Sequence, residues 1–130
     1  MPGRIEWDNE EKTILLTIYE GNMVLEEYYR VTDETFEALS KVSHPVHTIM
    51  LRQNVHSVPA TMSKVLQYAN KKTPDNLGIN VIVGANAMTK MIVRIGKVVA
   101  PKLAKEVYFA DSLEDARKII QDKLSEHSKK

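Results

Sequence analysis

With 130 residues, 43% of them hydrophobic and 27% charged, the chain has the length and composition of one ordinary globular domain. It contains no cysteine, which excludes disulfides, thiolate catalysis and cysteine-ligated metal sites. Residues 1–65 hold six basic against ten acidic side chains, and residues 66–130 hold twelve against seven, although the net charge is only +1. Such a dipole is typical of a mixed, solvated surface.

The chain shows no signal for secretion or membrane insertion. Residues 1–12 lack the apolar segment of a signal peptide, and no stretch approaches the roughly 18 consecutive apolar residues of a membrane span. We therefore expect a cytoplasmic protein with a single domain over residues 1–130.

The first predicted elements are two strands, Ile5 to Asp8 and Thr13 to Glu20, joined by the polar turn of residues 9–12. In this turn Asn9 is the residue that tolerates the left-handed conformation. The alternation of the second strand separates two sets of side chains, one on each face of the sheet. One face carries Ile14, Leu16 and Ile18, and the other carries Thr13, Leu15, Thr17 and Tyr19.

A helix is predicted from Val24 to about Val42, with Asn22 as its candidate N-cap. Residues 32–34 are an alternative break that would divide this segment in two. The apolar stripe of the helix comprises Leu25, Tyr29, Thr32, Phe36 and Leu39.

The apolar run from Val46 to Arg52 has the length of a buried strand and is predicted to be central in the sheet. After a loop, a helix is expected from Pro59 to about Lys72, because proline suits a first helical position. Ile79 to Val83 is a second apolar run, predicted to lie beside the first and parallel to it. The residues expected to be buried in these two strands are Ile49, Leu51, Val81 and Val83.

Asn86 is the candidate N-cap of a third helix, which ends before or at a turn containing Pro101. The basic residues Lys90, Arg94 and Lys97 lie on its predicted outer side, as on a solvated helix face. The predicted inner stripe contains Met88, Met91, Ile92, Ile95, Val98 and Val99.

A last short strand is predicted from Val107 to Ala110, and Ser112 then opens a final helix in a capping box with Asp115. This helix carries apolar residues up to Leu124, and residues 125–130 are expected to form a frayed tail. The resulting order is β-β-α-β-α-β-α-β-α. It indicates an α/β fold with a mixed, mostly parallel five-stranded sheet, an N-terminal hairpin and about four helices.

One face of the predicted sheet is apolar enough to need cover from the protein's own helices, from a partner or from a second copy of the chain. A homodimer therefore stays open as an expectation. The residues assigned to this face are Leu15, Tyr19, Met50, Ile82 and Tyr108.

The residues that carry chemistry form no catalytic or metal-binding pattern. The histidines, at positions 44, 47, 56 and 127, show no metal-ligand spacing. Hydroxyls near His56, such as Ser57, Thr61 and Ser63, occur without a nucleophile elbow. We therefore expect no enzyme, no metal and no cofactor.

Two further patterns concern anions. Residues 84–86 lie between a strand and a helix, with Lys90 one turn later, so their backbone amides can face an anion. Neither glycine-rich phosphate-binding motif is present. The basic side chains between Lys90 and Lys105 lack interleaved aromatic residues, which argues against nucleic acid as a partner.

Taken from Ile5 to Leu124, the pattern resembles a STAS-type domain, the fold of bacterial anti-sigma-factor antagonists. The segments that carry the resemblance are Tyr19-Glu20-Gly21, Thr48-Ile49-Met50-Leu51, the loop before Pro59, Val81-Ile82-Val83 and residues 107–116. In that family an Asp-Ser motif at the start of the second helix carries a phosphorylatable serine. The equivalent stretch here, residues 58–63, has no such pair, and Thr61 is the nearest hydroxyl, with Ser57 and Ser63 as alternatives.

The resemblance implies a non-enzymatic protein-interaction module in a bacterial regulatory system. Its partner would bind where the 46–52 strand leads into the following helix. An alternative is a small-molecule sensor that holds an anionic ligand at the helix N-termini near Pro59 and Asn86. The candidate binding residues are Asn54, His56, Ser57, Thr61, Ser63, Asn86 and Lys90, with Thr61 also the candidate phosphorylation site.

Overall fold

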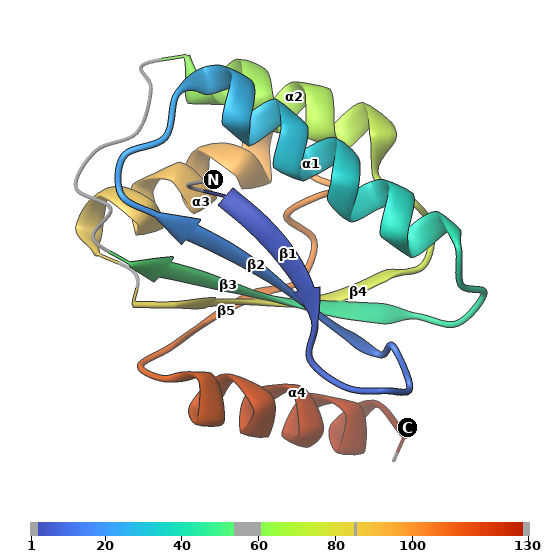
Figure 1. Cartoon of the computed structure of the whole chain (residues 1–130). Coiled ribbons are helices and arrows are strands. Elements are labelled where there is room, and N and C mark those ends of the chain that lie inside the picture. The colour runs from blue at the N-terminus through green and yellow to red at the C-terminus, as the bar shows by residue number, and fades with distance from the viewer. Residues whose placement is uncertain (1–2, 54–60, 85, 129–130) are drawn as a thin grey trace.

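The computed structural model describes residues 3–53, 61–84 and 86–128, which form one five-stranded sheet with helices on both faces (Figure 1). The strands follow chain order across the sheet, and only the first pair is antiparallel. They are β1 (Gly3–Trp7), β2 (Ile14–Glu20), β3 (Val46–Gln53), β4 (Leu77–Val83) and β5 (Val107–Ala110). The predicted α/β fold and element order are therefore confirmed, with β3 at the centre and β4 beside it.

Three helices cover one face of the sheet and the fourth covers the other face (Figure 1). They are α1 (Leu25–Ser40), α2 (Met62–Lys72), α3 (Ala87–Val99) and α4 (Leu113–Ser128). None of the helices among the described residues has the length and apolar character needed to cross a membrane.

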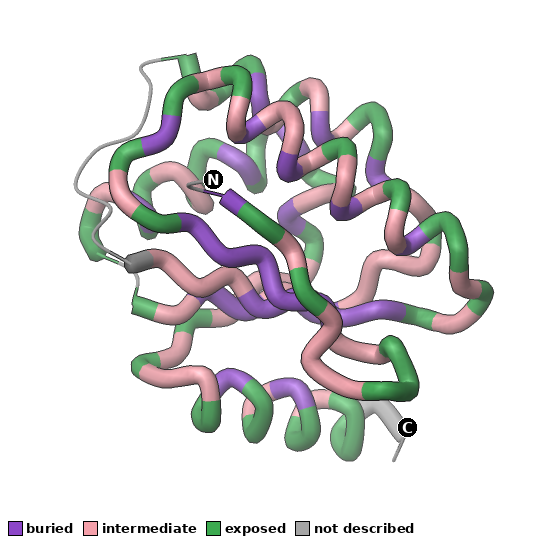
Figure 2. Tube along the Cα trace, in the orientation of Figure 1, coloured by how far each residue is buried: buried purple, intermediate pink, exposed green. Residues whose placement is uncertain are grey.

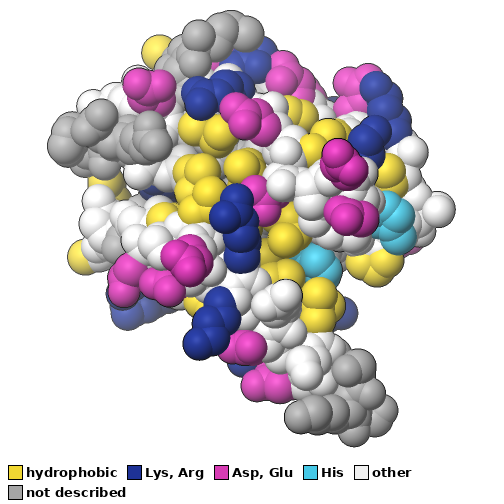
Figure 3. Space-filling model, turned by 60° about the horizontal axis from the view of Figure 1, so that its bottom comes forward, with side chains coloured by type: hydrophobic (Ala, Val, Ile, Leu, Met, Phe, Trp, Pro, Cys, Tyr) yellow, Lys and Arg dark blue, Asp and Glu magenta, His cyan; other side chains and the backbone are white. Residues whose placement is uncertain are grey.

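The α4 face holds the first part of the core. Leu16 and Ile18 of β2 pack there with Ile49, Val81 and Ile120, as the predicted alternation of β2 requires. Burial follows the strands β2, β3 and β4 and the sheet-facing sides of the helices (Figure 2). Leu51 and Val83, which were expected to be buried, are only half-buried, because one helix does not cover this face completely. Apolar side chains are accordingly visible at the centre of this side of the molecule (Figure 3).

The opposite face packs against α1 and α2. Leu15 and Val46 contact Leu39 of α1, and Tyr19 packs near Tyr28 and Val65. The face predicted to need cover is thus covered by the protein's own helices. Tyr108 was assigned to this face wrongly, since it pairs in register with Val81 and packs on the α4 side.

The first turn and the start of α1 differ from the sequence expectation. Lys12, with φ of 58°, takes the left-handed conformation for which Asn9 was the candidate. Asn9 stabilises the turn through its side chain, which accepts a hydrogen bond from the Thr13 backbone N–H at 3.0 Å. The N-cap of α1 is Val24, without a side-chain cap, so Asn22 is not the cap.

The α1 helix is continuous, and its buried face is rotated relative to the predicted stripe. The alternative break at residues 32–34 does not occur. Tyr28, Val31, Thr35 and Leu39 are the buried residues of the helix. Thr32 and Phe36, from the predicted stripe, instead line a cavity described below.

The largest correction concerns α3. The helix begins as predicted, with Asn86 as N-cap, and ends at Val99 before Pro101. However, Met91, Ile95 and Val98 of the predicted inner stripe are 54%, 41% and 80% exposed. Ile92 of the predicted stripe does face inward, together with Thr89, Val93 and Gly96, which were not predicted to do so. Both faces of α3 are apolar, and at Gly96 a Cβ would lie at an ordinary contact distance of 3.7 Å from the Ala104 Cβ.

The last helix is longer than predicted. Its Ser112 cap is confirmed, because the Asp115 N–H donates to Ser112 Oγ at 3.1 Å. Helical backbone continues to Ser128, so residues 125–128 are not a frayed tail. The described part of α2 begins at Met62, with Thr61 as N-cap residue, and the predicted start at Pro59 lies outside the described residues.

Candidate functional site

The predicted site residues that the structure describes lie at the carboxyl end of the parallel strands, where α2 and α3 begin (Figure 1). Thr61 and Ser63 are exposed at the start of α2. Thr61 is the N-cap residue, and its side chain makes no capping hydrogen bond. Both side chains are therefore accessible from solvent. Asn54, His56, Ser57 and Pro59 lie outside the described residues.

Asn86 and Lys90 lie at the start of α3. Asn86 Oδ1 accepts hydrogen bonds from the Thr89 N–H at 2.9 Å and from Thr89 Oγ1 at 3.1 Å. Lys90 Nζ lies 5.5 Å from the centroid of the Phe109 ring, in a cation–π contact. The Asn86 cap thus occupies one of the N-terminal amides that an anion would need. Ala85 lies outside the described residues.

The described histidines do not come together. His44 Nδ1 lies 3.1 Å from the Pro45 carbonyl oxygen, and the buried His47 accepts a hydrogen bond from the Ile79 N–H. Within residues 3–53, 61–84 and 86–128 no group of three or more histidine, aspartate or glutamate side chains is arranged to hold a metal ion.

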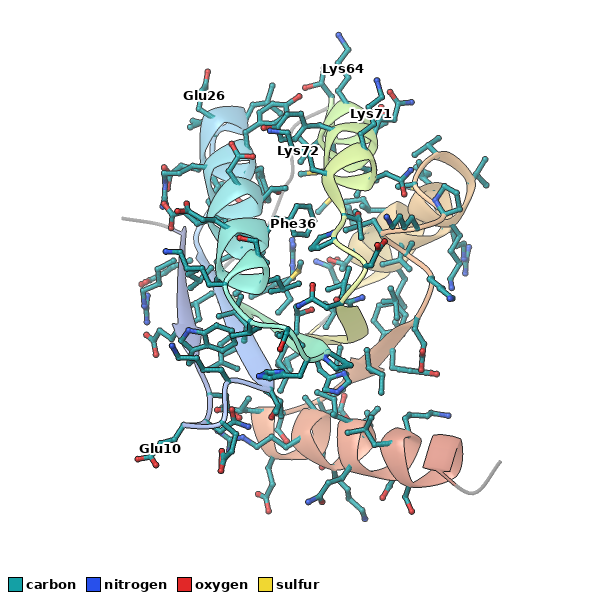
Figure 4. The ribbon with its side chains drawn as sticks, turned by 90° about the vertical axis from the view of Figure 1, so that its right-hand side faces the viewer. Glu10, Glu26, Phe36, Lys64, Lys71 and Lys72 are labelled. Atoms are coloured by element: carbon teal, nitrogen blue, oxygen red, sulfur yellow. The ribbon has the colours of Figure 1, made fainter. Side chains whose placement is uncertain are left out.

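A cavity of about 200 Å³ lies between the sheet and helices α1, α2 and α3. Phe36 points from α1 into the space between α1 and α2 (Figure 4) and forms part of the cavity wall. The cavity is partly open to solvent, so a molecule from solution can enter it. Its apolar wall includes Phe36, Met50, Val65, Leu66, Ile82 and Ile92.

Polar side chains line the sheet side of this cavity. Thr48 donates a hydrogen bond to Asn80 Oδ1, and Asn80 in turn donates to the carbonyl oxygens of Gly78 and Glu106, so this group is internally satisfied. Unlike Thr48 and Asn80, two other polar atoms at the cavity, Tyr28 Oη and Arg52 Nη2, are not hydrogen-bonded to any of the described residues. Both atoms are shielded from solvent. An unsatisfied buried polar group costs roughly 1–3 kcal/mol, and more when it is charged.

The two tyrosines beside Arg52 stay protonated at neutral pH. Burial raises the pKa of Tyr19 and of Tyr28, and the positive charge of Arg52 opposes this rise in both; for Tyr28 the approach of the Arg52 guanidinium to the hydroxyl opposes it as well. The protonated Tyr28 hydroxyl can donate and accept a hydrogen bond, whereas Arg52 has donors only. The described residues that line the cavity include no Asp or Glu.

Sequence reasoning missed this cavity, although one signal was present. In the predicted central strand, Thr48, Met50 and Arg52 alternate onto a single face. An arginine on the inward face of a central strand is costly unless it meets a counter-charge. The free-energy cost of burying this arginine indicates a binding site beside the central strand. That Tyr28 lies near Arg52 could not be predicted from the sequence.

The outer side of α3 forms a second candidate site, which we call the α3 surface. It consists of the exposed apolar residues Met91, Ile95 and Val98 and the exposed basic residues Lys90, Arg94 and Lys97. No acidic residue occurs between Asp75 and Glu106. The α3 surface is therefore both apolar and positively charged.

A search of solved structures finds a close structural match. It is the crystal structure of an uncharacterised protein of the DUF3478 family, described as having a SpoIIAA-like fold, from Shewanella loihica PV-4. The match has a TM-score of 0.60 and covers 89% of this chain and 90% of that chain. The fold is SpoIIAA-like. The resemblance to a STAS-type domain is thus confirmed for the fold.

The other comparisons add no relatives. A scan against protein-family models finds no match, and a search of curated proteins finds none. Sequence identity to the Shewanella loihica protein is 16%, so this similarity concerns the fold alone. The function has to be inferred from the sites of this chain.

Proposed function

We propose that this protein is a non-enzymatic interaction module of a bacterial regulatory system, which binds a protein partner at the β3–α2 end of the sheet and across the α3 surface. The observation that supports the proposal is the exposure of Met91, Ile95 and Val98 on one side of α3. Exposed apolar side chains grouped on one helix are typical of interaction sites. The SpoIIAA-like fold supports a regulatory role.

The charge of the α3 surface indicates the chemistry of the partner. Lys90, Arg94 and Lys97 flank the apolar residues, and α3 contains no acidic residue. The matching partner has an apolar centre with an acidic rim, because complementary charge guides association and fixes orientation. Thr61 and Ser63, exposed at the neighbouring start of α2, are proposed to lie at the edge of the same interface. Asn54, His56 and Ser57 remain candidates of the same interface.

An anionic-ligand sensor at the helix N-termini near Pro59 and Asn86 has less support. The Thr89 N–H already donates to Asn86 Oδ1 at 2.9 Å, so an anion would have to displace this cap. Replacing a capping side chain costs about 1 kcal/mol, which an incoming anion would have to recover.

The test is affinity capture from native cell extract with tagged protein, followed by titration calorimetry with the purified partner. The test variant is Ile95→Glu with Val98→Glu. The matched control is Val24→Glu with Leu124→Glu, which changes two exposed apolar residues outside α3. We expect wild type and control to bind one partner stoichiometrically, and the test variant to lose at least about tenfold in affinity.

Two results would contradict the proposal. One is equal partner affinity for the α3 variant and wild type. The other is the absence of a protein partner together with α3-dependent binding to anionic lipid vesicles, which would assign the surface to membranes instead. Thermal unfolding of all variants confirms folding, since exposed substitutions usually change stability by less than about 0.5 kcal/mol.

A further inference from the structure

We infer that the cavity between the sheet and helices α1, α2 and α3 is a binding site for a small organic acid. The carboxylate of the ligand would contact Arg52 and Tyr28, and its apolar body would fill the space under the helices. Neither residue belongs to the interface proposed above, so this inference goes beyond the proposed function.

The size of the cavity carries the first step. An engineered apolar cavity of about 150 Å³ is large enough to bind benzene. The cavity here, at about 200 Å³, has room for one aromatic ring or a short acyl chain with a small head group. Side chains such as Phe36, Leu66 and Ile92 give it an apolar wall that favours such a body over water.

The second step rests on the unpartnered polar atoms. Tyr28 is 5% exposed, and its Oη and the Nη2 of Arg52 are both shielded from solvent and without a partner among the described residues. Both residues line the cavity. Buried polar groups in native proteins are nearly always hydrogen-bonded, so the unpaired guanidinium nitrogen at this cavity indicates a missing acceptor, to which the neighbouring Tyr28 hydroxyl can also donate.

The third step identifies the charge of that acceptor. Among the described residues Arg52 forms no ion pair, and no Asp or Glu lines the cavity. Burial also keeps the Tyr28 hydroxyl protonated by raising its pKa. A guanidinium offers donors only, whereas a neutral phenol can donate and accept, and the planar guanidinium fits a carboxylate well.

The cavity and the α3 surface can be tested separately. The inner side of α3 contributes Ile92, Val93 and Gly96 to the cavity, whereas Ile95 and Val98 face outward. The Ile95→Glu, Val98→Glu protein should therefore bind a cavity ligand like wild type. If the α3 surface proves not to bind a protein partner, ligand binding in the cavity is unaffected. If the cavity proves not to bind an acid, partner binding at the α3 surface is unaffected.

The experiment is titration of full-length protein with benzoate, phenylacetate and hexanoate, followed by calorimetry and by amide chemical shifts in NMR. Benzyl alcohol tests the need for the charge, and acetate tests the need for the apolar body. We expect at least one of the three acids to bind and to shift the amides of Ile92 and Val93, with benzyl alcohol and acetate at least about tenfold weaker.

Variants locate the head group. Arg52→Gln should weaken binding of the best acid at least about tenfold, and Tyr28→Phe should weaken it several-fold. Tyr29→Phe is the matched control, because Tyr29 directly follows Tyr28 on α1, lies outside the cavity lining and contacts Tyr68 through its ring. Without ligand, Tyr28→Phe should be at least as stable as wild type, since the lost hydroxyl has no partner.

Three outcomes would overturn the inference. The first is no binding of any of the three acids up to about 10 mM. The second is equal binding of the best acid by wild type and a folded Arg52→Gln protein. The third is equal binding of benzyl alcohol and benzoate, which would make the cavity a site for neutral apolar molecules.

Discussion

His47 and Ile79 connect the two central strands through a side chain, because Nδ1 of His47 accepts a hydrogen bond of 2.9 Å from the backbone N–H of Ile79. An accepting Nδ1 carries no proton, so the imidazole is neutral with its hydrogen on Nε2. The bond lies where the β3–β4 register shifts between Val46 and Thr48, and it satisfies a buried amide at that irregularity.

This bond predicts a pH dependence of stability. Burial lowers the pKa of His47 below its ordinary value near 6.5, an effect that the charge of Glu106 partly opposes. The unfolded chain therefore takes up a proton at higher pH than the folded chain. We expect the free energy of unfolding to be constant above about pH 6.5 and to decrease as the pH is lowered further. The contribution of His47 to this decrease is at most about 1.4 kcal/mol per pH unit.

Urea unfolding at pH 7.5 and 5.5 measures this effect, and His47→Asn is the control, because its Oδ1 can accept the Ile79 N–H without titrating in this range. The other three histidines are common to both proteins. The same loss of stability on acidification in wild type and His47→Asn would show that His47 is not its source.

Gly78 is predicted to be intolerant of a side chain because of the same imidazole. A Cβ at this position would lie 2.5 Å from Nδ1 of His47 and 2.7 Å from its Cε1. Gly78→Ala should therefore displace the ring from the Ile79 N–H and cost about 1–3 kcal/mol of unfolding free energy.

Gly96→Ala is the matched control for Gly78→Ala. Its Cβ would meet Ala104 Cβ and Leu66 Cδ1 at ordinary contact distances of 3.7 and 3.8 Å. Alanine is favoured over glycine inside a helix, so this variant should gain about 0.5–1 kcal/mol. Denaturant unfolding that ranks Gly78→Ala at or above Gly96→Ala would contradict both assignments.

Ile49 is predicted to be a major contributor to stability. It is completely buried in β3, within the core on the α4 face. Ile49→Ala should lower the unfolding free energy by about 2–5 kcal/mol, through lost burial and the cavity left behind. The control Val98→Ala, at an 80% exposed position, should change it by less than about 0.5 kcal/mol. A loss below about 1 kcal/mol for Ile49→Ala would mean that the site repacks.

Thr61→Glu is predicted to affect binding rather than stability. The residue is exposed at the N-cap of α2, and the first turn of this helix has no acidic residue, so the helix dipole tolerates a negative charge there. We expect a nearly unchanged melting temperature and weaker binding of the protein partner, because a new charge at the interface would be desolvated without a counter-ion. Phosphorylation of Thr61 would act in the same direction.

Titration calorimetry of the purified partner measures this difference, and Ser63→Ala is a neutral control two residues away. Unchanged affinity for Thr61→Glu would place the start of α2 outside the interface. Binding would then be confined to the α3 surface.

The order of the strands and helices could be predicted because the sequence patterns that indicate it are local. The alternation of β2 and the apolar runs that became β3 and β4 depend on side chains near each other in sequence. The caps at Asn86 and Ser112 were found for the same reason, since a capping side chain bonds to amides two or three residues away. The sequence by itself determined the fold to this extent.

The orientation of α3 and the existence of the cavity were decided only by the tertiary structure. α3 has apolar residues on two sides, so its periodicity cannot say which side faces the sheet, and only packing in the fold turns Thr89, Ile92, Val93 and Gly96 inward. Likewise, Tyr28 and Arg52 come to line one cavity only when α1 packs against the sheet. Contacts of this kind depend on packing between distant segments, and local spacing carries no information about them.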